Sequence, residues 1–131
     1  MRHDHAAELK LAASRLDGTA KHTQIIASPV LSEMTGHTIL LKPENLQVTG
    51  SFKIRGAYNK IASLTDEELE RGIVTASAGN HAQGVAYAAR ERGAKATILM
   101  PEITPPLKVD ATKAYGADVV LHGEVFDEAA A

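Results

Sequence analysis

Apolar residues along this chain follow two alternating patterns. Short continuous apolar runs, typical of strands buried in a parallel sheet, occur at 38–41, 73–76, 96–100 and 119–121. Segments with apolar residues at helical spacing lie between and after these runs, at 51–63, 65–72, 81–92, 105–115 and 124–131. Because strand and helix alternate with short links, the pattern predicts an α/β fold, with a small parallel β-sheet flanked by helices.

The residues before the first run form a separate unit. An amphipathic N-terminal helix is predicted over 6–20, with an apolar stripe formed by Leu9, Ala12, Ala13 and Leu16. The segment from Ser28 to Leu31 should be extended, because Pro29 biases its predecessor away from helix. We therefore divide the chain into an N-terminal helix with an extended segment, residues 1–37, and an α/β domain, residues 38–131.

Two of the predicted helices have recognisable start signals. Thr65 and Glu68 match a capping box, which opens the short helix at 65–72. Pro105-Pro106 starts the helix at 105–115, because proline suits the first helical turn. The periodicity of that helix places three residues inward, namely Leu107, Ala111 and Ala114.

Composition narrows the classes of function. The 131 residues carry 14 basic and 16 acidic side chains, a net charge of −2, with two Phe and three Tyr, so no basic aromatic surface for nucleic acid is expected. The absence of Cys excludes disulfides and thiolate chemistry and favours a reducing, cytoplasmic setting. No apolar run approaches membrane-spanning length, so no membrane partner is expected. The sequence His3-Asp4-His5 is better explained as a frayed terminus than as a metal site.

One lysine occupies an unusual place in the pattern. Thr49 and Ser51 are N-cap residue types, so Lys53 should fall in the first turn of a helix. The helix dipole disfavours a cation there by ~0.3–1 kcal/mol, and the apolar Phe52 and Ile54 flank the lysine. Both influences favour the neutral amine, the form that attacks a carbonyl. The alternative is a solvated surface lysine, which is the commoner case.

The stretch from Ser77 to Gly84 has the composition of an anion-binding turn. It follows a predicted strand and precedes a predicted helix, the place where open α/β sheets bind ligands. Small residues let backbone amides approach an anion, and the helix N-terminus adds unpaired N–H groups and a positive dipole. An ordinary strand-to-helix turn capped by Ser77 or Asn80 is the alternative.

Three segments resemble the threonine dehydratases (threonine ammonia-lyases) and the related serine dehydratases and racemases: 41–47 (LKPENLQ), 49–57 (TGSFKIRGA) and 77–84 (SAGNHAQG). These are fold-type II pyridoxal phosphate enzymes, and the resemblance extends from about Ser28 to the last residues. It implies the smaller domain of the tryptophan synthase β-like architecture. We therefore expect an N-terminal fragment of such an enzyme, in which residues 1–37 dock on a larger domain.

The resemblance also implies roles for particular residues. Lys53 would carry pyridoxal 5′-phosphate as a Schiff base and move the substrate's Cα proton, and Phe52 would pack near the cofactor ring. Asn80 would donate a hydrogen bond to the cofactor's 3′ oxygen. Backbone amides would line the pocket for the amino acid carboxylate, contributed by Ser77, Ala78, Gly79, Asn80 and His81. The implied reaction is β-elimination, which converts L-threonine to 2-oxobutanoate and ammonia, and L-serine to pyruvate.

Two features refine what the resemblance implies. Serine racemases carry a second serine at the position of Ala78, which supplies a proton from the opposite face of the cofactor. Alanine has no proton to give, so elimination is favoured over racemisation. The family's phosphate-binding glycine run lies downstream of the asparagine loop and does not occur in this sequence. We therefore expect the isolated chain to bind the cofactor weakly and to have little activity.

A second hypothesis, in which the protein is not an enzyme, stays open. The chain is also consistent with a non-catalytic α/β module whose exposed helices pair with a second copy. For the enzyme, we expect a small amino acid as substrate, a homo-oligomeric assembly and no metal ion.

Overall fold

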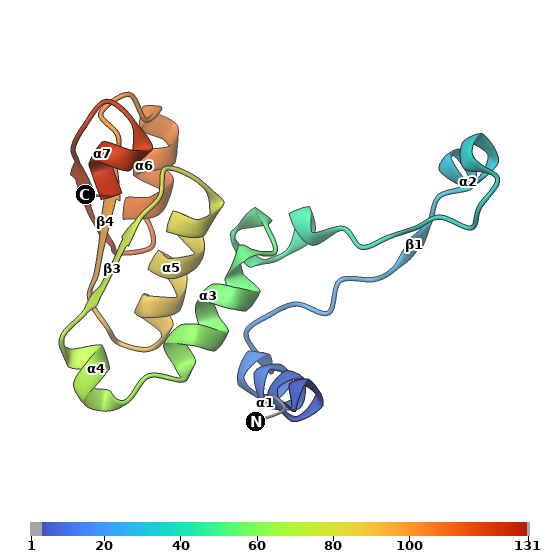
Figure 1. The fold of residues 1–131 in the computed structure, drawn as a ribbon, viewed down its shortest axis with the longest axis horizontal. Helices are drawn as coiled ribbons and strands as arrows, with labels where there is room; N and C mark the ends of the chain where they lie inside the picture. Colours follow the sequence, from blue (N-terminus) through green and yellow to red (C-terminus); the bar gives the residue numbers. More distant parts are fainter. Residues whose placement is uncertain (1–3, 131) are drawn as a thin grey trace.

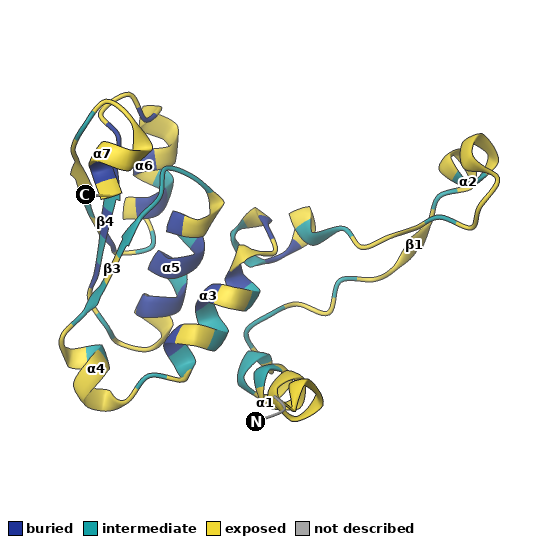
Figure 2. Cartoon of the chain, in the orientation of Figure 1, coloured by how far each residue is buried: buried dark blue, intermediate teal, exposed yellow. Residues whose placement is uncertain are grey.

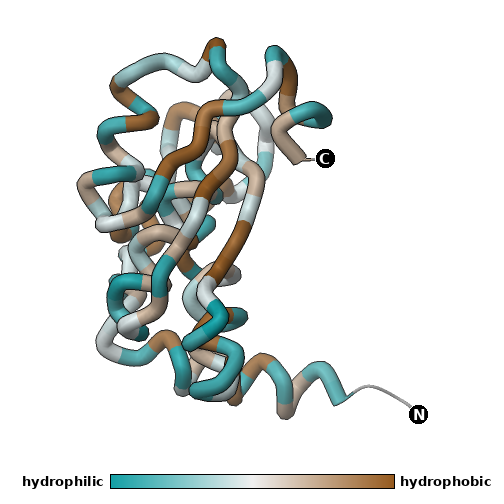
Figure 3. Tube along the Cα trace, turned by 90° about the vertical axis from the view of Figure 1, so that its left-hand side faces the viewer, coloured by the Kyte–Doolittle hydropathy of each residue, from teal (hydrophilic) through white to brown (hydrophobic). Residues whose placement is uncertain are grey.

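A three-stranded parallel sheet forms the centre of the computed structural model, which describes residues 4–130. Its strands are β3 (Ile73–Ala76), β4 (Ala96–Met100) and β5 (Asp118–Leu121), in the order β3-β4-β5. Figure 3 shows the hydrophobic stretches of neighbouring strands side by side. The strands predicted at 73–76, 96–100 and 119–121 are thus confirmed, with β3 and β5 as the edges of the described sheet.

Helix α5 (Asn80–Glu91) holds the body of the molecule together. It contacts β3 and β4, and it packs along α3 (Lys53–Ala62). Its buried residues are small apart from one valine: Ala82, Gly84, Val85, Ala86, Ala88 and Ala89. Figure 2 shows this helix mostly in the buried class. Small side chains let neighbouring elements approach closely, so α5 can lie tightly between the sheet and α3.

Three shorter helices complete the body. Helix α4 (Asp66–Glu70) begins with the predicted capping box, in which Thr65 and Glu68 bond each other's backbone. Helix α6 (Pro106–Lys113) contacts α5 and β5, and α7 (Phe126–Ala130) contacts β3 and β4. The α/β class with a small parallel sheet and flanking helices is confirmed.

The N-terminal part leaves this body as a long arm. Helix α1 (His5–Leu16) lies against α3, and the chain then runs outward through β1 (Ile26–Ala27) to α2 (Pro29–Thr35) at the tip (Figure 1). It returns through β2 (Leu40–Leu41) and two 3₁₀ turns, η1 (Glu44–Leu46) and η2 (Val48–Gly50). No helix within residues 4–130 is long and apolar enough to cross a membrane.

The strand predicted at 38–41 does not join the parallel sheet. Residues 40 and 41 form β2, which pairs antiparallel with β1 in a separate two-stranded sheet. A short apolar run indicates a strand but not its partner. Because β1 contributes only two residues, its apolar signal was too short to be recognised, and the sheet has three strands rather than four.

The extended conformation predicted from Ser28 to Leu31 is also wrong, since α2 starts at Pro29. Ser28 itself is extended, as the proline rule requires, and its side chain accepts a hydrogen bond from the Leu31 amide at 3.4 Å. Ser28 is therefore an N-cap and Pro29 the first helical residue, a position for which its fixed φ is suited.

The N-terminal helix differs from the prediction at both ends. It stops at Leu16 instead of residue 20, and Gly18, just beyond this end, takes a left-handed φ of 74°. It begins at His5, because the Asp4 side chain accepts hydrogen bonds from the Ala6 and Ala7 amides. Asp4 and His5 are thus ordered rather than frayed. The rest of the predicted frayed terminus, residues 1–3, lies outside the described residues.

Helix α6 turns a different face inward from the one predicted. Its buried residues are Val109 and Thr112, which lie three apart on one face. Leu107 is 81% exposed, and Ala114 is exposed as well. With the helix starting at Pro106, Leu107 lies about 200° around the helix axis from Val109, so the two cannot share a face.

Helices α3 and α5 approach each other closely at Gly84. A Cβ at Gly84 would lie 3.3 Å from the Lys53 carbonyl carbon and 3.4 Å from both the Ile54 nitrogen and the Lys53 oxygen. These are backbone atoms, which cannot rotate away. The absence of a side chain at Gly84 therefore sets how near the first turn of α3 lies to α5.

This contact predicts opposite effects for two glycine-to-alanine substitutions. Gly84→Ala gains up to ~1 kcal/mol of helix propensity but overpacks the contact by ~1–3 kcal/mol, so we expect a net loss of about 1 kcal/mol in the free energy of unfolding. Gly56→Ala, in the interior of α3, meets nothing within 4 Å and should gain about 0.5–1 kcal/mol. Urea unfolding measures both, and an equal gain at the two positions would contradict the contact.

Candidate functional site

Lys53 is the first residue of α3, as predicted, but the cap differs. The N-cap is Phe52, which makes no side-chain capping bond, and the Ser51 hydroxyl accepts a long hydrogen bond of 3.4 Å from the Lys53 amide. Thr49 does not cap the helix; it has a φ of 65°, an uncommon conformation for a β-branched residue. Gly50 follows with a φ of 72°, so two left-handed residues turn the chain into α3.

The Lys53 amine lies at the surface beside an aromatic ring. Its Nζ is 4.9 Å from the centroid of the Phe52 ring, a cation–π distance, and Phe52 is 58% exposed. Ile54, the other apolar neighbour in sequence, is completely buried in the interior. Lys53 is exposed, with the Phe52 ring beside its amine, as an amine that must meet an incoming carbonyl needs to be.

The Ser77 to Gly79 turn links β3 to α5. The Ser77 amide continues the sheet by donating to the Leu99 carbonyl at 3.0 Å, and its hydroxyl accepts from the Gly79 and Ala82 amides at 3.3 and 3.2 Å. Asn80 and His81 are exposed. The hydrogen bonds of the described residues include none donated by the Asn80 or His81 amide, so these helix N-terminal donors face outward unpaired.

The structure brings Lys53 next to the helix that this turn starts. Gly84, against which the Lys53 backbone lies, is four residues after Asn80, or about 6 Å along the helix axis. Within residues 4–130, no hydrogen bond joins the Lys53 side chain to the turn. A cavity of about 270 Å³ between α3, β3 and α5 includes His81 among its lining residues but none of Ser77 to Asn80.

A polar network that the sequence analysis missed anchors the other side of α3. Arg55 forms a two-point ion pair with Glu44, with Nε to Oε2 at 2.8 Å and Nη2 to Oε1 at 2.9 Å. The Thr23 hydroxyl donates to the same carboxylate at 2.7 Å. These donors hold the pKa of Glu44 down at about 2 from an ordinary 4.5, the Arg55 hydrogen bonds being the main cause, and Glu44 in turn raises the pKa of Arg55.

Gln47 extends this network into the arm. It is only 3% exposed, and its side-chain oxygen accepts from the Lys21 and Val48 amides while its nitrogen donates to the Lys21 carbonyl. Glu44 and Gln47 both lie in the segment 41–47 that carried the family resemblance. Their polar character was visible in the sequence, but nothing in it indicates that their partners lie about twenty residues earlier and, for Arg55, in the following helix.

Lys53 thus starts a helix that packs on α5, and the turn that opens α5 lies at the carboxyl end of β3. The family model described as pyridoxal-phosphate dependent enzyme matches residues 16–131. The chain belongs to this family.

Among members of this family, the chain is similar to threonine ammonia-lyases and to a serine racemase. The chain is 57% identical to an L-threonine ammonia-lyase from Thermotoga maritima over 93% of its length and 30% of that protein's. Among solved structures, the processed threonine deaminase isoform 2 of Solanum lycopersicum matches with a TM-score of 0.88 and 44% identity, over 96% of this chain and 37% of that one. Maize serine racemase matches with a TM-score of 0.89 and 36% identity, over 94% and 37%. The chain thus spans about a third of the length of these relatives.

The residues present fit the cofactor's chemistry in two respects. Lys53 offers an exposed primary amine, the group that condenses with an aldehyde. At the turn, the unpaired Asn80 and His81 amides are donors for an anion, and a Cβ on the preceding Gly79 would meet nothing within 4 Å outside its two chain neighbours.

The Glu44 ion pair predicts a pH dependence of stability. Because the folded-state pKa of Glu44 is lowered to about 2 from 4.5, its contribution is fully present above pH 4.5 and is lost as the pH falls towards 2. Glu44→Gln should lower the free energy of unfolding by ~1–2 kcal/mol near pH 7. Urea titrations of both proteins from about pH 7 to pH 3 should show this difference shrinking below about pH 4.5. A difference that stays constant with pH would contradict the ion pair.

Proposed function

We propose that the protein carrying this chain eliminates water from a small β-hydroxy amino acid, converting L-threonine to 2-oxobutanoate and ammonia, and L-serine to pyruvate and ammonia. The observation that carries the proposal is the packing of the Lys53 backbone on Gly84, in the helix that starts at the amide turn. The L-threonine ammonia-lyase of Thermotoga maritima and the threonine deaminase of Solanum lycopersicum support this substrate class.

Each site residue is assigned a role in this reaction. Bound pyridoxal 5′-phosphate supplies an electron sink that makes the substrate's Cα proton removable. Lys53 would hold the cofactor through its amine, and that amine, once the substrate's own amine has displaced it, would take up the proton. Phe52, whose ring already borders the Lys53 amine, packs beside the cofactor ring. Asn80 donates to the oxygen on the ring.

The turn binds the substrate's carboxylate. The Ala78, Asn80 and His81 amides donate to it, and Ser77 and Gly79, whose amides are bonded within the fold, line the same pocket. The positive end of the α5 dipole adds to the attraction. Ser77 keeps the turn in shape, because its hydroxyl accepts the Gly79 amide of the turn and the Ala82 amide of α5. Ala78 has no side-chain proton, which favours elimination over the racemisation named for the maize serine racemase.

We also propose that residues 1–37 dock on a part of the protein outside this chain. The arm exposes large apolar side chains that a folded protein normally covers: Ile25, Ile26, Val30, Leu31 and Met34. The segment 38–131 would then be the smaller α/β domain of the enzyme.

Covalent trapping tests the role of Lys53. In the full-length protein, incubation with pyridoxal 5′-phosphate followed by borohydride reduction should fix the label on Lys53, as peptide mass spectrometry would show. Lys53→Ala should remove this label and lower the rate of 2-oxobutanoate formation from L-threonine by at least about 10³-fold. Lys113→Ala, which alters an exposed lysine of α6, is the control and should change neither.

Two results would refute the proposed function. One is a Lys53→Ala protein that keeps both the label and the activity. The other is formation of the D-amino acid faster than the keto acid, which chiral chromatography of the same reaction mixture would detect and which would favour racemisation.

Hydrogen exchange and sedimentation together test the docking of residues 1–37 against the alternative of self-association. If the arm covers a surface of the same enzyme, the backbone amides of the arm should exchange hydrogen more slowly in the full-length protein than in the 131-residue chain. The isolated chain should then sediment as a monomer when dilute. A tight dimer of the isolated chain, weakened by Met34→Lys, would instead favour the module that pairs with a second copy.

A further inference from the structure

The two sides of the first turn of α3 carry different chemistry. Lys53 and Arg55 are two residues apart, so their side chains leave the helix about 200° apart. Whatever holds Arg55 on one side therefore determines the direction in which Lys53 points on the other.

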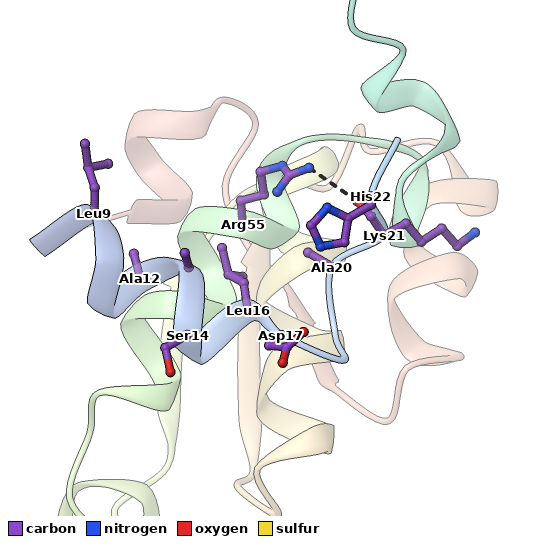
Figure 4. A pocket seen from close by; sticks show the side chains of 10 residues that line it. Leu9, Ala12, Ser14, Leu16, Asp17, Ala20, Lys21, His22 and Arg55 are labelled. Carbon is purple, nitrogen blue, oxygen red and sulfur yellow. Dashed lines mark hydrogen bonds between the residues drawn. The ribbon is translucent and has the colours of Figure 1, made fainter. Parts of the chain in front are cut away.

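Arg55 is held by acceptors from two distant segments. Both oxygens of Glu44 accept from its guanidinium, and the Lys21 carbonyl accepts from Nη2 at 3.4 Å, the contact drawn as a dashed line in Figure 4. The figure also shows Arg55 directed from α3 towards the segment that follows α1. A planar guanidinium bound at several points has one orientation, which a lysine at the same position would not reproduce.

Gln47 holds one of these acceptors, the Lys21 carbonyl, in place. The buried side-chain amide of Gln47 bonds both the backbone N–H and the backbone carbonyl of Lys21. The Gln47 backbone carbonyl accepts from the Gly50 amide at 2.8 Å. The same residue thus fixes the carbonyl that Arg55 contacts and the turn that leads into α3.

We propose that Glu44, Gln47 and Arg55 are positioning residues for Lys53, which lock the rotation of the first turn of α3 so that the amine faces the Ser77 to His81 turn. Gly84 sets how near α3 lies to α5, and this network sets which way the helix is turned. The inference rests on the proposed function, because it assumes that Lys53 is the residue that binds the cofactor's aldehyde.

The rate of trapping of Lys53 reports its position directly. The full-length protein is incubated with pyridoxal 5′-phosphate, quenched with borohydride at increasing times, and the label on Lys53 is divided by the label on Lys113 in the same sample. Since misplacing a reacting group by about 1 Å costs up to 10²-fold, Glu44→Gln and Arg55→Lys should each lower this ratio at least about tenfold. Glu44→Asp keeps the carboxylate and should retain more of it.

Glu91→Gln is the matched control. It removes the carboxylate of another Glu–Arg pair, that of Arg90 at 3.0 Å, which lies at the far end of α5, and it should leave the ratio unchanged. Because unfolding would also lower the ratio, the ratio of each variant is compared at equal folded fraction, measured by circular dichroism. With L-threonine as substrate, the positioning variants should lose kcat while KM changes little.

The outcomes distinguish failure of the positioning role from failure of the proposed function. If wild-type protein traps the label on Lys53 and folded Glu44→Gln and Arg55→Lys proteins trap it equally fast, the positioning role is wrong and the proposed function stands. If wild-type protein does not trap the label selectively on Lys53, both are wrong. Should Glu44→Gln unfold, Arg55→Lys decides the question, with rates corrected for the folded fraction by circular dichroism.

Discussion

The arrangement of this chain depends on the contact between the backbone of Lys53 and Gly84. Two helices can lie this close only where one of them lacks a side chain, and the atoms opposite Gly84 are backbone atoms at 3.3 to 3.4 Å. Because α5 is fixed to the sheet through small buried residues, the contact transmits the position of the sheet to α3. The segments around residues 53 and 77, separated in sequence, thereby belong to one rigid unit.

Much of this fold could be predicted from the sequence, because its main elements repeat strong local signals. The runs 73–76 and 96–100 were long enough to identify as strands, and the Thr65 capping box located the start of α4 to within a residue. The arm could not be predicted. Its strands are two residues long, and Ser28 followed by Pro29 suits an extended segment as well as a helix start.

The candidate site was predictable to a different degree. The sequence located Lys53 at a helix start and the Ser77 stretch at a strand-to-helix turn, because both are local properties. The partners of Arg55 and Gln47 are contacts between segments up to 34 residues apart, and no periodicity reports them. Glu44 and Gln47 belong to one of the segments that carry the family resemblance. Their hydrogen bonds show what this segment does in the fold: it ties the arm to the helix that starts with Lys53.

The order of the strands leaves the edge of β3 open in the isolated chain. Strand β3 lies at an edge of the described sheet, and Val74 on it is 71% exposed, so a row of backbone donors and acceptors is open beside an apolar side chain. Any extended segment that adds there lengthens the sheet next to Ser77. A flank that can recruit a further strand within a larger enzyme is therefore also a flank prone to cross-chain aggregation when the chain is produced alone.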